Sequence, residues 1–161
     1  MEALRYLTDD ERIRLLARAE SRSYGPDEEI LGESEYNEDI YILIGGTARI
    51  EKRTERGRAA IGHINAGEAF GEMSLLDGSP THLSVVADVP CEAFVLPLAS
   101  VADLLEEDAR LASHLYHSLA VMLARRLRDR TSEVVTPPAR AAADELTIVE
   151  PSEEAARRPT G

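Results

Sequence analysis

The sequence has one cysteine in 161 residues, Cys91, and it has no tryptophan. A single cysteine excludes an internal disulfide framework and any zinc or iron–sulfur site built from several cysteines. No apolar run approaches the roughly 20 residues that span a bilayer, and residues 1–7 lack the apolar core of a signal peptide. We therefore expect a cytoplasmic protein that does not insert into a membrane.

Basic residues are also scarce, because 18 Lys and Arg stand against 30 Asp and Glu. The excess is not confined to the end of the chain, since residues 1–134 hold 25 acidic and 15 basic side chains, a net charge of −10. Binding to nucleic acid depends on Lys and Arg that neutralise phosphates. We expect no DNA binding, and a transcription regulator is the least favoured function.

Catalytic and metal-ligating patterns are missing as well. No Ser/His/Asp set and no paired carboxylates stand out, so we expect no catalytic residue and no enzyme. His114 and His117 lie three residues apart, a spacing that could hold a metal ion, but no carboxylate or cysteine accompanies them at ligand spacing. We therefore predict no metal site.

What is present begins with a helix signal and continues with strands. Thr8-Asp9-Asp10-Glu11 forms a capping box, which predicts a helix that runs to about Glu20. From Tyr24 onward, short apolar runs alternate with turn residues, as in Gly45-Gly46 and Arg56-Gly57. The predicted strands cover residues 40–44, 47–54, 59–64, 83–88 and 92–96.

Helical patterns return after Pro97. Residues 100–106 predict a short helix and residues 108 to about 132 a long one. We therefore predict an α+β fold, a β-roll of the jelly-roll type with an N-terminal helix and C-terminal short and long helices. Residues 1–134 form one domain, and residues 135–161 are expected to be a disordered tail rich in Pro, Ala and Glu.

The most informative segment is residues 67–87. It reads Gly-Glu-Ala-Phe-Gly-Glu-Met-Ser-Leu-Leu-Asp-Gly-Ser-Pro-Thr-His-Leu-Ser-Val-Val-Ala. This segment resembles the phosphate-binding cassette of the cyclic nucleotide-binding domain family, in which Phe-Gly-Glu is followed by an apolar helical turn, Pro-Arg and a strand of small residues. Residues 40–46 and 24–30 resemble two further motifs of the family, and the resemblance covers roughly residues 4–130. The bacterial catabolite-activator/Fnr type is the most similar variety.

The resemblance implies a ligand pocket around the cassette. It assigns phosphate binding to the amides that begin at Gly71, and it assigns a hydrogen bond with the ribose hydroxyl to Glu72. Gly71 has an equally simple structural role, because a tight turn at this point needs glycine. The candidate pocket residues are Phe70, Gly71, Glu72, Met73, Ser74, Thr81, His82 and Ser84.

The cassette departs from the family at one position, since Thr81 stands where the family has its phosphate-binding arginine. Losing one partner of a buried charge pair costs about 2–5 kcal/mol, which is roughly 30- to several-thousand-fold in affinity. His82 and Thr81 could compensate in part, or both could be ordinary exposed loop residues. Ser84 could touch the ligand or form the polar side of an alternating strand. We expect no certain cofactor and at most a weakly bound cyclic nucleotide.

The long helix carries two further patterns. One apolar face either forms a homodimer, which we favour, or packs back on the β-roll; its residues are Leu111, Leu115, Leu119 and Met122. Arginines at 125, 126, 128 and 130 gather near its end, and we interpret them as cations that complement the helix C-terminus.

Three functions follow from these observations. The first is a stand-alone, non-enzymatic regulatory or adaptor module with a degenerate cassette, which contacts a protein partner. The second is a genuine sensor of a cyclic mononucleotide or dinucleotide in signal transduction. The third, a transcription regulator, would need a helix-turn-helix domain, which we do not expect after the long helix.

Overall fold

Strand β3 (Asp39–Gly45) lies at the centre of the fold because both of its faces are buried. Ile40 and Ile42 belong to one apolar cluster, which the strand shares with the helices, whereas Tyr41 and Leu43 belong to a second cluster between the two sheets. A strand buried on both faces reads as a continuous apolar run, which explains the sequence of residues 40–44.

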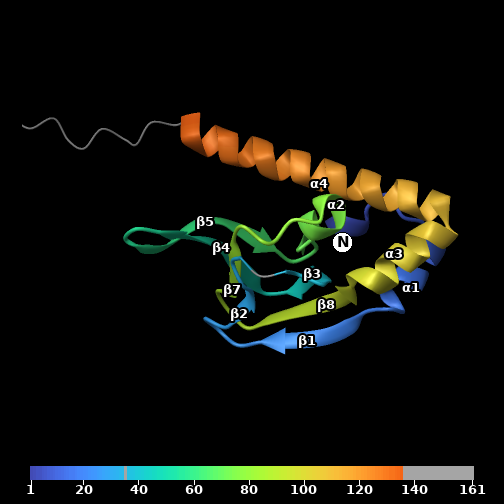
Figure 1. The fold of residues 1–161 in the computed structure, drawn as a ribbon, viewed down its shortest axis with the longest axis horizontal. Helices are drawn as coiled ribbons and strands as arrows, with labels where there is room; N and C mark the ends of the chain where they lie inside the picture. The colour runs from blue at the N-terminus through green and yellow to red at the C-terminus, as the bar shows by residue number, and fades with distance from the viewer. Residues whose placement is uncertain (35, 136–161) are drawn as a thin grey trace, which may run out of the picture.

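Two antiparallel four-stranded sheets form the roll (Figure 1). The structure is a computed structural model that describes residues 1–34 and 36–135. The first sheet has the order β1 (Glu20–Tyr24), β8 (Cys91–Pro97), β3 and β6 (Ala69–Phe70). The second has the order β2 (Glu29–Leu31), β7 (Ser84–Ala87), β4 (Thr47–Thr54) and β5 (Gly57–Asn65). The predicted roll is confirmed. The tail was predicted for residues 135–161; Val135 ends the last helix of the structure, and residues 136–161 lie outside the described residues.

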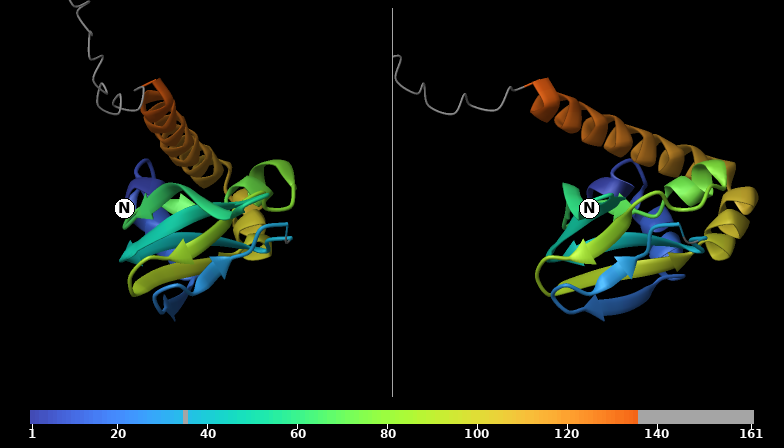
Figure 2. Two further views of the ribbon diagram at one scale, coloured as in Figure 1. Left: turned by 90° about the vertical axis from the view of Figure 1, so that its left-hand side faces the viewer. Right: turned by 60° about the vertical axis from the view of Figure 1, so that its left-hand side comes forward.

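Helical elements precede, interrupt and follow the strands. They are η1 (Glu2–Leu4), α1 (Asp9–Leu16), α2 (Met73–Asp77), α3 (Leu98–Glu107) and α4 (Ala109–Val135). Helix α4 crosses one side of the roll above α2 and η1, and its later turns extend past them (Figures 1 and 2). No helix in the described part of the chain has the length and apolar character needed to cross a membrane.

The first helix is shorter than its sequence predicts. The capping box is present, with the Glu11 amide donating to Thr8 Oγ1 and the Thr8 amide donating to Glu11 Oε2 at 2.7 Å. The helix nevertheless ends at Leu16, and β1 begins at Glu20, so the prediction of a helix to Glu20 was wrong. Strand β1 is almost entirely exposed and pairs with β8 alone. An edge strand of this kind has no apolar alternation by which to be identified.

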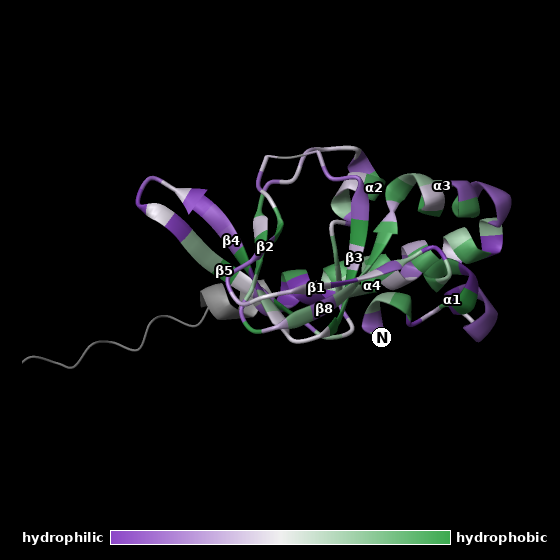
Figure 3. Cartoon of the chain, turned by 90° about the horizontal axis from the view of Figure 1, so that it is seen from below, coloured by the Kyte–Doolittle hydropathy of each residue, from purple (hydrophilic) through white to green (hydrophobic). Residues whose placement is uncertain are grey.

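The apolar face of α4 belongs to the core of its own chain. Leu111, Leu115, Leu119 and Met122 are at most 3% exposed and pack with η1, α1, α3 and β3. The assignment of these four residues to a partner surface is therefore corrected, because their side chains are already covered. Figure 3 shows the matching pattern, with apolar segments where the helices meet and a polar tip on the β4–β5 hairpin. A homodimer remains a prediction, and it would need another face.

Contacts with the N-terminal segment hold α4 in place. His114 Nδ1 lies 2.9 Å from Glu11 Oε2, and the ring of His117 stacks on Tyr6 with centroids 4.0 Å apart. The Tyr6 amide donates to Ser118 Oγ at 3.0 Å. Both histidines thus contact side chains of the N-terminal segment, and no cluster of three metal-ligating side chains occurs among residues 1–34 and 36–135.

Candidate functional site

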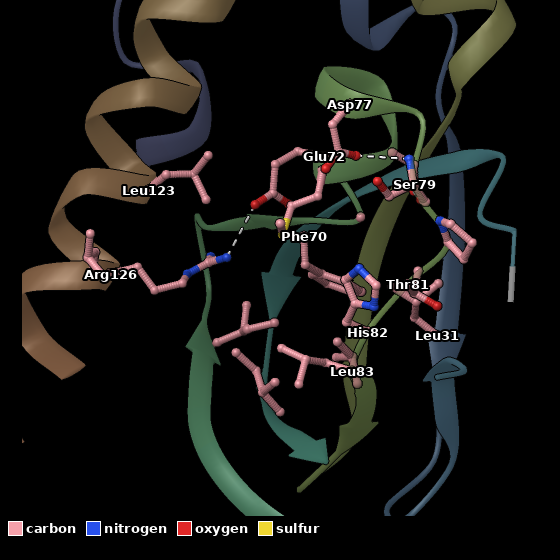
Figure 4. A pocket seen from close by; sticks show the side chains of 18 residues that line it. Leu31, Phe70, Glu72, Asp77, Ser79, Thr81, His82, Leu83, Leu123 and Arg126 are labelled. Carbon is pink, nitrogen blue, oxygen red and sulfur yellow. Dashed lines mark hydrogen bonds and ion pairs between the residues drawn. The ribbon is translucent and has the colours of Figure 1, made fainter. Parts of the chain in front are cut away.

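A cavity of about 240 Å³ lies between the cassette, the second sheet and α4 (Figure 4). Its walls are mostly apolar and come from elements far apart in the sequence, including Leu31, Ile50, Val85 and Leu123. The candidate residues that line it are Phe70, Gly71, Glu72, Met73, Ser74, Thr81 and His82. The cassette therefore encloses a space that a small ligand could fill.

Ser84 is the candidate that does not line the cavity. It is 1% exposed, and its hydroxyl accepts a hydrogen bond from the Glu33 amide at 3.1 Å. All four residues of β7 are buried, so the strand does not alternate as its sequence suggested. Ser84 holds the end of β2 against β7, and its predicted contact with a ligand is corrected on this ground.

The turn at Gly71 is fixed by a residue that sequence reasoning missed. Gly71 has φ +78°, and a Cβ there would lie 2.7 Å from Asn37 Nδ2 and 2.7 Å from the Asp39 carbonyl. The amide of Asn37 donates to the carbonyl oxygens of Gly71 (3.0 Å) and Asp39, and Asn37 Oδ1 accepts from the Asp39 amide. Asn37 thus ties the cassette to β3, and no motif in the sequence marks it.

This turn directs Glu72 into the interior. The side chain is 3% exposed, although it comes from the start of a short surface helix. Burial raises the pKa of Glu72, and the nearby Arg126 guanidinium opposes that rise. A buried carboxylate that has one ion-pair partner at 3.5 Å keeps unused acceptor capacity, which suits a hydroxyl group of a ligand.

Arg126 is the second residue that the sequence left unassigned to the site. From α4 its guanidinium donates to the Ala69 carbonyl at 2.7 Å, and it lies 3.5 Å from Glu72 and 3.9 Å from Glu68. Its Nε is buried without a hydrogen-bond partner among the described residues. The interpretation of Arg126 as a cation for the helix C-terminus was wrong, because the helix continues to Val135 and the side chain turns into the cavity.

Two hydroxyl groups of the cassette donate their protons within the chain. Thr81 Oγ1 donates to the Gly32 carbonyl, and Ser74 Oγ donates to the Ser79 carbonyl at 3.2 Å. His82 is exposed and lines the cavity on the same side as Thr81, across from Arg126 (Figure 4). A phosphate at the family's position would therefore meet few side-chain donors and no arginine or lysine on its own side of the cavity.

Comparison with known proteins places these features in a family. The family model for the cyclic nucleotide-binding domain matches residues 21–108. The chain is 31% identical over 126 residues to the cAMP-activated global transcriptional regulator Vfr of Pseudomonas aeruginosa, covering 75% of this chain and 57% of that protein. It is 28% identical over 81 residues to the cAMP-dependent protein kinase regulatory subunit of Mycosarcoma maydis, covering 50% of this chain and 15% of that protein.

Solved structures confirm the fold. A cyclic nucleotide-binding domain from Methylobacillus flagellatus superimposes with a TM-score of 0.75 at 23% identity, over 83% of this chain and 80% of that one. The chain spans less than two thirds of the length of both curated relatives.

Proposed function

Because the chain belongs to the cyclic nucleotide-binding domain family, we propose that it is a non-enzymatic regulatory module that does not sense cyclic nucleotides with the family's usual strength. Regulation is the role of this domain class. The cassette is degenerate at Thr81, and the module acts through contact with a protein partner in the cytoplasm. Residues 1–134 form this module.

The main support for this proposal is the position of the basic side chain that lines the cavity. Arg126 is the only arginine or lysine among the described residues that line it, and it lies beside Glu72 on the α4 side. On the cassette side, the Thr81 hydroxyl donates its single proton to Gly32. A charge-assisted contact to phosphate is about twice as strong as a neutral one, so this side offers a cyclic phosphate much less than an arginine would.

Isothermal titration calorimetry with cAMP, cGMP and cyclic di-GMP tests the proposal. We expect dissociation constants in the high micromolar range or weaker, since the lost charge pair costs about 2–5 kcal/mol. A low-micromolar constant for any of the three would contradict the degenerate-cassette proposal.

A substitution tests the cause. Thr81→Arg should strengthen cAMP binding by about tenfold or more, because it returns a cation to the cassette side. Thr81→Gln is the matched control, since it also removes the bond to Gly32 but adds no charge. Equal affinities in the two variants would show that the missing charge is not what weakens binding.

The second candidate is a genuine cyclic nucleotide sensor. The observation that favours it is the open cavity, which is lined by the turn at Gly71 and Glu72 on one side and by residues of α4 on the other. In such a sensor the ligand would reach Arg126 on α4 and shift the position of that helix against the roll. The calorimetry above separates this candidate from the first.

A further inference from the structure

The charged groups of the cavity wall leave little attraction for an anion. The side chains that carry or can carry charge are Glu72, Asp77, His82 and Arg126, within the described lining. Apart from His82, the lining holds two carboxylates and one guanidinium. An anion near Arg126 would have to compete with Glu72 and also with Glu68, which lies 3.9 Å from the same guanidinium.

The polar groups that remain are better suited to a ligand that donates hydrogen bonds. The carboxylate of Glu72 is almost completely buried and can accept from a hydroxyl group. The hydroxyl protons of Ser74 and Thr81 are committed to the carbonyls of Ser79 and Gly32. On the cassette side the side chains therefore offer a ligand an acceptor in Glu72, whereas Arg126 Nε, the buried donor without a partner among the described residues, lies on the α4 side.

The rest of the wall is apolar. Phe70 and Leu83 line the cassette side, and Leu123 and Leu127 line the α4 side. The volume of about 240 Å³ lies just below the roughly 300–1,000 Å³ that is typical of sites for drug-sized ligands, which indicates a small occupant.

From this chemistry we infer that the cavity binds a small uncharged ligand with an apolar or flat body and a hydroxyl group that donates to Glu72. The inference rests on the proposed function and extends it, since it assigns the cavity a ligand class in place of the cyclic phosphate. The Glu72–Arg126 pair is the selective element because it cancels the charge that would otherwise attract an anion.

Adenosine and cAMP form a matched pair of probes, since both contain the same base and a ribose 2′-hydroxyl but only cAMP is charged. Calorimetric titration of the full chain should give a dissociation constant for adenosine at least about tenfold lower than that for cAMP. No detectable binding of adenosine at about 2 mM, or equal or tighter binding of cAMP, overturns the inference.

Two substitutions test the role of charge through the ratio of the cAMP constant to the adenosine constant. Glu72→Gln leaves Arg126 without its nearest carboxylate. The cAMP constant should then fall relative to the adenosine constant, so that the ratio decreases by about fivefold or more. The loss of the hydroxyl contact affects both probes, so the ratio isolates the charge. Thr81→Arg should also lower the ratio, and this variant provides the test if Glu72→Gln does not fold.

Arg128→Gln is the control, because this residue is on the same helix but does not line the cavity; its ratio should stay that of the unmodified chain. A ratio unchanged by both test variants overturns the inference. A low-micromolar constant for cAMP contradicts the proposed function as well, whereas weak binding of both probes overturns the ligand class alone.

Discussion

Replacing Gly71 with alanine probes how tightly the cassette is held against β3. The backbone there has φ +78°, and the new Cβ would lie 2.7 Å from Asn37 Nδ2 and 2.7 Å from the Asp39 carbonyl oxygen. A side chain in the left-handed region costs about 1–2 kcal/mol, and forcing an atom into a filled space costs about 1–3 kcal/mol more. We expect a total loss of about 2–5 kcal/mol, which lowers Tm by roughly 5–15 °C.

Gly78→Ala is the matched control for this substitution. Gly78 follows α2 with φ +68°, but a Cβ there meets nothing within 4 Å, so only the backbone cost of about 1–2 kcal/mol applies. Urea titrations followed by circular dichroism would measure both free energies of unfolding. Equal losses in the two variants would refute the reasoning, because they would show that the close approach to Asn37 and Asp39 adds nothing.

Two further predictions concern the attachment of α4. Burial by itself would raise the pKa of Glu11, but hydrogen bonds from His114 and Thr8 outweigh it and hold the pKa below its ordinary value, so this carboxylate adds stability that is lost as pH falls through the lowered pKa. Glu11→Gln should lower the free energy of unfolding by about 1–2 kcal/mol at pH 7. It should also weaken the fall of that free energy below pH 4.5, as urea titrations from about pH 3 to 7 would show. An unchanged fall at acid pH would speak against this role. Leu119→Ala should cost about 2–5 kcal/mol equally at all protein concentrations, because Leu119 packs within its own chain, and a loss that depends on concentration would instead indicate a partner.

The elements that are determined by residues close together in the sequence could be predicted. The capping box at Thr8, the apolar run of β3 and the turn at Gly46 all appear where expected. Each depends on neighbours within a few residues, so the sequence contains its cause. Strand β1 was missed because it is a polar edge strand whose pairing with β8 involves residues more than 65 positions away.

The candidate site also combines residues marked by a local motif with residues that only the fold brings together. The cassette residues form a continuous segment, and their placement around a cavity followed from a motif. Asn37 and Arg126 lie 34 and 55 positions from Gly71 and join the site only through the fold. The arginine cluster on α4 was a signal for Arg126, but without the direction of the helix it could not be separated from ordinary capping. Ser84 shows the reverse error, since a motif position became a structural one.

The attachment of α4 also makes it a lever. Met122 is the last fully buried side chain described on the helix, and Val135 lies 13 residues beyond it, or about 20 Å at the rise of an α-helix. A tilt of about 10° around Met122 would move the end of the helix by about 3 Å. Arg126 lies one turn beyond this fulcrum and contacts the cavity wall. A small displacement of its guanidinium would therefore be magnified severalfold at Val135, where the helix ends.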